Sequence, residues 1–212
     1  MPFEGTLAKS IRLLHPYAAD YRYLEAKGLN NTSVVLQING PSSSALLTSD
    51  LEPNGWQQLQ TNHPDLHCDV FKFPHHGAWR DADAGKLLDR VNPSIVIISV
   101  GTEGYEKYNH PNPHVFNALA QRPHIHLLCT QATNQCQVAA QSKRLSVIDR
   151  YKTQAINNTQ QLIFSKRGCP CAGTIVVELD NTAHIIQPDP KFHRNKIIET
   201  YFYDNHKCKY EI

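Results

Sequence analysis

Three short segments of the sequence hold side chains that could bind metal ions or transfer protons. Asp50 follows the apolar run ALLTS, the pair His75 and His76 follows VFKFP, and His110 closes a polar loop after SIVIISV. Imidazole is the commonest protein ligand of transition metals. A lone aspartate after a strand is more often a turn former. Adjacent histidines before Gly77, which lets the backbone turn sharply, favour a functional role.

Apolar runs typical of strands alternate with helix-compatible segments around these residues. Fully apolar runs such as SIVIISV, in a strand-then-helix order, predict an α/β layered fold rather than an all-β sandwich. We expect strands at residues 10–14, 33–38, 45–48, 70–73, 94–100 and 125–129, and helices at 55–61, 81–91 and 113–119.

The predicted strands should bring the candidate side chains together. Ligands of open α/β sheets bind beyond the carboxyl ends of the strands. If the strands are parallel neighbours, Asp50, the His75 and His76 pair and the loop ending in His110 therefore converge on one edge of the sheet. The alternative is three ordinary loops that contain acids and histidines.

Composition and charge set the broad class of the protein. The chain has 212 residues, 41% of them hydrophobic, and a net charge of +2, which indicates a folded globular protein and not a nucleic-acid binder by bulk charge. No run approaches the roughly 18 apolar residues of a membrane span, and the N-terminal residues lack the pattern of a secretory signal. We expect a cytoplasmic protein with no membrane association.

The second half of the chain differs in character from the first. Residues 131–168 are rich in Gln, Asn, Ser and basic residues and are longer than an ordinary connection, which indicates an insertion. Residues 174–179 and 184–186 resemble a closing hairpin. We therefore divide the chain into a main part at 1–130, an insertion at 131–168, and a hairpin with a tail at 169–212.

Cysteine and histidine residues flank the insertion and recur in the tail. Thiolates together with an imidazole form closed tetrahedral zinc sites, which would tie the insertion to the tail. The alternative is that these cysteines are small buried apolar residues. The predicted structural zinc ligands are Cys136, Cys171, His193 and Cys208, with Cys129 and Cys169 as alternates.

Several segments together resemble a known family. The segments NNTSVVLQI, ALLTSDLE, CDVFKFPHHGAW, NPSIVIISVG and YNHP are similar to the metallo-β-lactamase-like domain of the ComEC competence DNA-uptake family and its soluble relatives. The resemblance covers about residues 11–130. It implies the C-terminal half of an αββα layered fold.

The resemblance also implies roles for individual residues. In that superfamily the aspartate that matches Asp50 bridges two metal ions, and the histidine that matches His76 binds one of them. His75 is expected to contact the substrate or the transition state, and His110 lies in a loop at the mouth of the site. The implied cofactor is a pair of zinc ions, and the implied substrate is a phosphodiester or nucleic acid.

One departure from the family pattern bears on function. The family places a His-x-His-x-Asp-His cluster before the strand that matches residues 33–38, and this sequence has none there. Ser49 also stands where the family commonly has glycine. Asp50 and His76 alone are too few ligands for catalytic zinc, which usually has three from the protein. We expect a metallo-hydrolase completed by a second chain or by a missing N-terminal half. The alternative is a non-catalytic, zinc-stabilised binding or regulatory module.

Overall fold

The structure is a computed structural model that describes residues 10–79, 83–101, 110–131 and 171–189, together with Lys191 and His193. Its strands are β1 (Ile11–His15), β2 (Val35–Asn39), β3 (Ser44–Leu47), β4 (Val70–Lys72), β5 (Ile95–Ile98), β6 (His126–Cys129), β7 (Val176–Leu179) and β8 (Ala183–Gln187). Its helices are α2 (Tyr21–Ala26), α3 (Pro53–Asn62), α4 (Asp83–Val91) and α6 (Pro113–Ala120), with short 3-10 turns η1 (Leu29–Thr32) and η2 (Pro74–Gly77).

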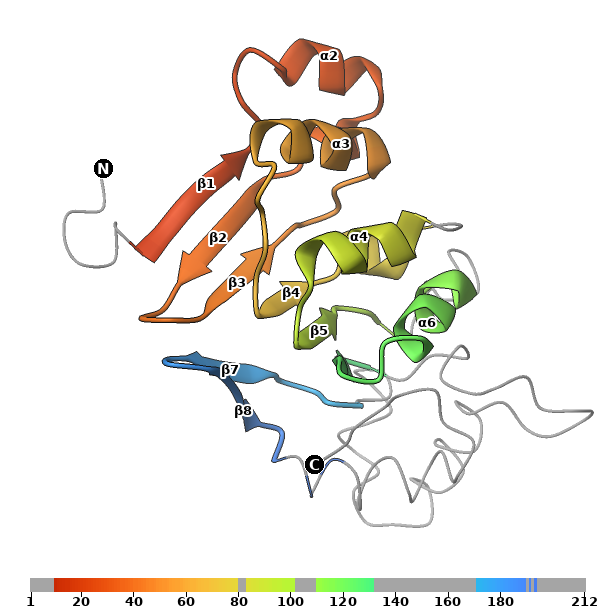
Figure 1. Cartoon of the computed structure of the whole chain (residues 1–212). Helices are drawn as coiled ribbons and strands as arrows, with labels where there is room; N and C mark the ends of the chain where they lie inside the picture. Colours follow the sequence, from red (N-terminus) through yellow and green to blue (C-terminus); the bar gives the residue numbers. More distant parts are fainter. Residues whose placement is uncertain are drawn as a thin grey trace, which may run out of the picture.

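The first six strands form one mixed sheet in the order β1-β2-β3-β4-β5-β6 (Figure 1). The β1, β2 and β3 strands pair antiparallel, and β3 to β6 pair parallel. This mixed arrangement of strands and helices confirms the predicted α/β class, and the αββα layering stays a prediction. The short helix α2 was not predicted; its N-cap residue Asp20 makes no side-chain capping hydrogen bond, and its first and last turns hold no acidic and no basic residue, respectively.

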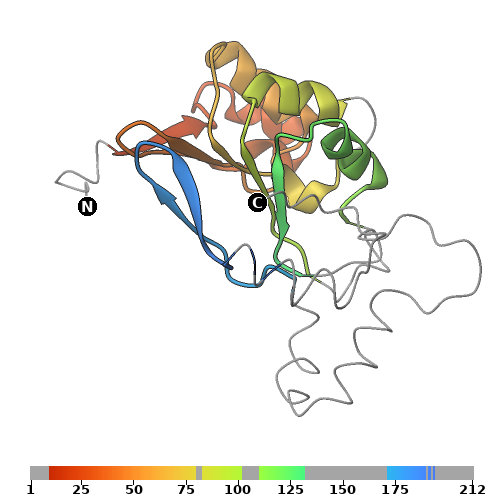
Figure 2. The same ribbon diagram turned by 60° about the horizontal axis from the view of Figure 1, so that its bottom comes forward.

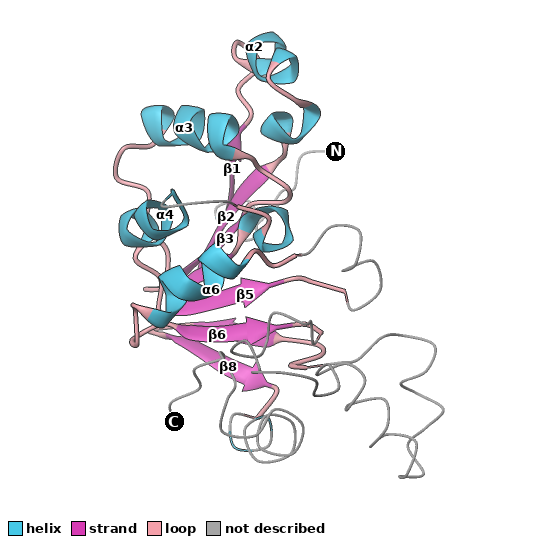
Figure 3. Cartoon of the chain, turned by 90° about the vertical axis from the view of Figure 1, so that its right-hand side faces the viewer, coloured by secondary structure: helices cyan, strands magenta, loops and turns pink. Residues whose placement is uncertain are grey.

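Helices α3, α4 and α6 cover one face of the sheet (Figures 1 and 3). One cross-strand row on this face joins the side chains of Leu46, Phe71, Val96 and Leu127, each exposed by 2% or less. Trp56 of α3 packs against Phe71 at 6.0 Å between ring centroids. Burying each such side chain contributes about 1.5 to 3 kcal/mol, so this row helps to hold the helices on the sheet.

The β7 and β8 hairpin lies on the side of the sheet away from the helices (Figure 2). Its turn contacts the β2 to β3 connection, where Ser42 N donates to the Asp180 carbonyl at 3.2 Å. At the other end, Ala172 N donates to the Cys129 carbonyl at 2.8 Å. The predicted division of the chain stays a prediction, because residues 132–170 lie outside the described part.

The hairpin leaves one end of this second face open to solvent. Leu13, Leu36 and Leu47 are cross-strand partners on β1, β2 and β3, and the same row continues to Lys72 on β4. The side chain of Leu13 is 62% exposed and that of Leu47 is 37% exposed. We call Leu13, Leu36 and Leu47 the open apolar row. It ends beside the carboxyl ends of β3 and β4.

None of the described helices is long and apolar enough to cross a lipid bilayer.

Candidate functional site at the carboxyl ends of β3 and β4

The structure brings Asp50 and His76 together. Asp50 lies three residues beyond β3, and His76 lies in η2 directly beyond β4. Since β3 and β4 are parallel neighbours, both turns leave the sheet at the same edge. Asp50 Oδ1 and His76 Nε2 are 3.3 Å apart, and both side chains are partly open to solvent.

Left-handed backbone conformations position these two side chains. Ser49 has φ 45°, and His75 and His76 have φ 47° and 53°, values that residues other than glycine adopt at a cost. The two turns are joined by a hydrogen bond in which His75 N donates to the Ser49 carbonyl at 3.1 Å. Glycine would adopt the positive φ of Ser49 without this cost.

A hydrogen bond to the backbone orients the His76 ring. Its Nδ1 contacts the carbonyl oxygen of Ser99, the residue after β5. A carbonyl oxygen can only accept, so Nδ1 carries the proton and Nε2 is the nitrogen that faces Asp50. This is the arrangement by which a carbonyl partner orients metal-binding histidines.

His75 has a carboxylate partner that the sequence analysis missed. Its Nδ1 lies 3.5 Å from Glu52 Oε1. Glu52 is itself held by amide donors, Asn30 Nδ2 at 3.1 Å and Asn31 Nδ2 at 3.5 Å. The sequence could have identified Glu52 as a candidate, because it follows Asp50 by two residues at the start of a predicted turn.

His110 lies beside His75, so the loop that ends in His110 meets the His75 and His76 pair, as we expected from the order of the strands. The two rings are 5.6 Å apart between centroids and are inclined by 60°. Gly77 makes this approach feasible: its φ is 76°, and a Cβ atom there would lie 2.7 Å from Pro111 Cβ. Asn112 N donates to the Gly77 carbonyl at 2.7 Å, which ties the two segments together.

Lys72 adds a positive charge that the sequence analysis did not single out. Its Nζ donates to the Ser49 carbonyl at 2.8 Å. Burial lowers the pKa of Lys72, and the nearby Asp50 carboxylate opposes that shift by favouring the ammonium form. The ammonium therefore faces the same turn that presents Asp50.

The described residues hold too few ligands at this edge for a complete metal site. No three His, Cys, Asp or Glu side chains within the described ranges converge on one point. Asp50 and His76 supply two donors, whereas zinc sites use three or four.

The structure describes two of the four predicted structural zinc ligands, and these two are in contact. Cys171 Sγ lies 3.4 Å from His193 Nε2, and both side chains are buried. Burial lowers the pKa of His193 to about 4, so its imidazole is neutral at pH 7. Cys136 and Cys208 lie outside the described residues, as does the alternate Cys169.

Comparison with known proteins gives one informative similarity. This chain is similar to ComE operon protein 3 of Bacillus subtilis (strain 168). The two are 32% identical over 132 residues, which make up 61% of this chain and 16% of that protein. No protein-family model matches the chain, and no solved structure matches it.

The similarity is confined to a small part of the relative. The chain spans less than a fifth of the length of ComE operon protein 3. What it shares with that protein is therefore one segment, and activity of the whole protein enters below only as a proposal.

Proposed function

We propose that this chain provides the metal-binding edge of a metallo-β-lactamase-like hydrolase that cleaves phosphodiesters, nucleic acids among them, in a competence-related process. The observation that carries the proposal is the pairing of Asp50 with His76. With Nδ1 of His76 donating to the Ser99 carbonyl, Nε2 is the ring nitrogen that faces the Asp50 carboxylate, at 3.3 Å. A cation bound between this nitrogen and the carboxylate would be held by both.

The residues suit the roles that the family resemblance implies. Asp50 can bridge two cations through its two oxygens, and His76 can bind one through Nε2. Two bound zinc ions would activate a water near neutral pH and neutralise charge on a phosphoryl oxygen. His75, which contacts Glu52, and His110 beside it would be available to hydrogen-bond an oxyanion or a leaving oxygen.

The missing metal ligands and the open apolar row call for one partner. A second chain, or an N-terminal half of the domain, would supply the His-x-His-x-Asp-His cluster and pack a second sheet on Leu13, Leu36 and Leu47. This docking would complete the αββα layers on the face that the β7 and β8 hairpin covers only in part. The row ends beside Asp50, so a sheet on it would bring new ligands to the site.

The decisive experiment is reconstitution of hydrolysis. The chain alone should hydrolyse bis(p-nitrophenyl) phosphate very slowly with zinc present, and addition of the completing half should restore the rate. Asp50→Ala and His76→Ala should then abolish it. Asp83→Ala, which removes an exposed carboxylate on α4, should leave it unchanged. Restored activity that survives both site substitutions would contradict the proposal.

The contact between Cys171 and His193 favours a second candidate, a non-catalytic binding or regulatory module stabilised by zinc. Tetrahedral zinc with bonds of about 2.3 Å to sulfur and 2.0 Å to nitrogen places these ligands about 3.5 Å apart. The observed separation is 3.4 Å. This candidate predicts one tightly bound zinc that is lost in Cys171→Ser and retained in Asp50→Ala. Elemental analysis of the purified variants separates the two functions.

A further inference from the structure

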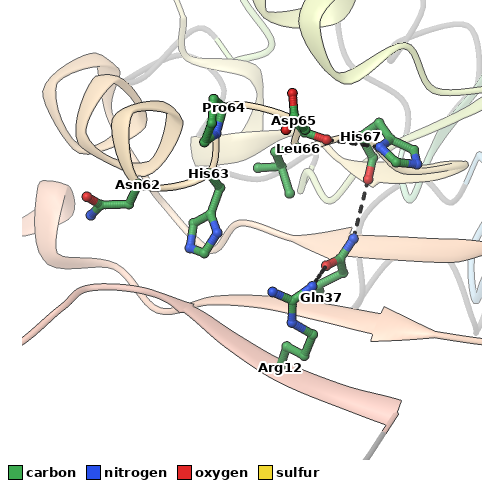
Figure 4. A pocket seen from close by; sticks show the side chains of 8 residues that line it. All are labelled: Arg12, Gln37, Asn62, His63, Pro64, Asp65, Leu66 and His67. Carbon is green, nitrogen blue, oxygen red and sulfur yellow. Dashed lines mark hydrogen bonds between the residues drawn. The ribbon is translucent and has the colours of Figure 1, made fainter.

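A cavity that shares no described lining residue with the candidate site has the features of an anion-binding pocket. It has a volume of about 270 Å³ and lies where β1 and β2 meet the end of α3 and the connection to β4 (Figure 4). Its lining residues are Arg12, Gln37, Asn62, His63, Pro64, Asp65, Leu66 and His67. We propose that this pocket binds the phosphate group of a small ligand or of a nucleic acid, with Arg12 as the principal contact.

The Arg12 guanidinium is held in the wall of the pocket by a neighbour. Arg12 and Gln37 are cross-strand partners, and Arg12 Nη1 donates to Gln37 Oε1 at 3.2 Å. A second hydrogen bond orients the Gln37 amide, because its Nε2 donates to the His67 carbonyl at 3.3 Å. Gln37 is 8% exposed. The guanidinium is thereby positioned in advance, which lowers the entropy lost when a ligand binds.

No described residue neutralises the charge of Arg12. Among the residues that the structure describes, Arg12 forms no ion pair, and Nε and Nη2 have no hydrogen-bond partner. Asp65 is the only acidic residue among the described residues of the lining, and Figure 4 shows its carboxylate turned away from Arg12. The free edge of a guanidinium binds two oxygens of a phosphate or a carboxylate side by side.

His63 supplies a second polar group from the opposite side of the pocket. Figure 4 shows its ring reaching from the end of α3 towards the strand that carries Arg12. The ring stacks on Tyr17 with centroids 5.9 Å apart, and its Nε2 lies 3.2 Å from the Leu14 carbonyl. Nε2 therefore donates to the backbone, and Nδ1 is then an acceptor that remains for a ligand. The P–OH group of a hydrogen phosphate can donate to Nδ1 while its other oxygens face Arg12, whereas an ionised carboxylate has no proton to donate.

Two features limit the strength of binding. The carboxyl end of α3 at Asn62 carries partial negative charge, which opposes an anion. The amide of Asn62 is already engaged, because its Nδ2 donates to Asp20 Oδ2 at 3.2 Å. We therefore expect a dissociation constant for inorganic phosphate in the millimolar range, roughly 1 to 10 mM.

The test is a titration of the full-length chain with sodium phosphate at constant ionic strength, followed by amide chemical shifts. Saturable shifts should centre on Arg12, Gln37 and His63. Arg12→Gln should weaken binding by about tenfold or more, because it removes the charged donors. Arg22→Gln, which removes the same charge from the exposed surface of α2, should bind phosphate normally.

Titrations with other ligands distinguish a phosphate group of nucleic acid from a free phosphate. Tighter binding of a dinucleotide than of phosphate assigns the pocket to a nucleic-acid backbone, and the reverse order assigns it to a free phosphate. Acetate binding as tightly as either overturns the phosphate assignment. Phosphate-induced shifts that are unchanged in Arg12→Gln, or reduced equally in Arg22→Gln, would show that phosphate does not bind in this pocket. None of these outcomes depends on the proposed hydrolase activity.

Discussion

Asp50 Oδ1 and His76 Nε2 lie 3.3 Å apart although 26 positions separate the two residues in the sequence. The approach depends on the parallel pairing of β3 with β4 and on left-handed turns after both strands. A hydrogen bond from His75 N to the Ser49 carbonyl joins these turns. The conformation of the turns is therefore the first property to test.

Ser49→Gly should stabilise the protein. Ser49 has φ 45° and an exposed side chain, and a left-handed conformation costs a residue with a Cβ about 1 to 2 kcal/mol. The added flexibility of glycine in the unfolded chain offsets about 0.5 to 1 kcal/mol. Chemical denaturation should thus show a net gain of up to about 1.5 kcal/mol in the free energy of unfolding.

Ser33→Gly is the matched control for this prediction. Ser33 has φ −57° and ψ 138°, which any residue adopts without strain. Only the entropic cost of glycine applies there, so this variant should lose about 0.5 to 1 kcal/mol. Equal effects at the two positions would contradict strain at Ser49.

Gly77→Ala should both destabilise the protein and displace His110. Its φ of 76° penalises any Cβ, and a Cβ there would lie 2.7 Å from Pro111 Cβ. We expect a loss of about 2 to 4 kcal/mol from the sum of backbone strain and overpacking. Chemical shifts of the His110 ring should change in the folded variant.

Gly173→Ala separates the two contributions. Gly173 has φ 68°, but no atom lies within 4 Å of a Cβ built on it. This variant should therefore lose only the backbone part, about 1 to 2 kcal/mol. A loss as large as that of Gly77→Ala would show that the contact with Pro111 is unimportant.

The buried His15 should make the protein less stable in mild acid. Burial lowers its pKa, outweighing the hydrogen bond from Nε2 to the Asn31 carbonyl at 2.8 Å. The unfolded chain thus binds a proton more readily than the folded chain, and stability is lost as the pH falls below about 6.5. His15→Gln keeps a donor for Asn31 and removes the titration.

Urea denaturation at pH 7.5 and pH 5 measures this effect. The free energy of unfolding should fall less between the two pH values in His15→Gln than in the wild type. Some dependence will remain, because the pKa of His193 is also lowered by burial. His67→Gln, which changes an exposed ring, should behave as the wild type does. An identical dependence in His15→Gln would refute the assignment.

Polar substitutions in the open apolar row should reduce both the aggregation of the isolated chain and its binding to the completing half. Leu13→Ser and Leu47→Ser remove exposed apolar side chains, at 62% and 37% exposure. The isolated chain should then aggregate less, as judged by light scattering. The same variants should bind the completing half more weakly. Leu29→Ser removes a leucine of η1 that is more exposed, at 70%, and should not affect that binding.

The sequence alone determined the strands of the main sheet and the position of the candidate ligands at their ends. Apolar runs such as IVII and the polar residues that follow them are local features, so their order along the chain identifies them. The segment around His75 and His76 was recognisable because adjacent histidines before a glycine are unusual.

Tertiary structure alone decided which side chains meet. The contacts of Glu52 with His75 and of His76 with Ser99 join residues that are 23 positions apart in the chain. Periodicity carries no information on such contacts, because they depend on which strands are neighbours and on how each turn leaves the sheet. The same reason explains Arg12: its place in a pocket follows from cross-strand pairing with Gln37 and from the packing of α3 above it.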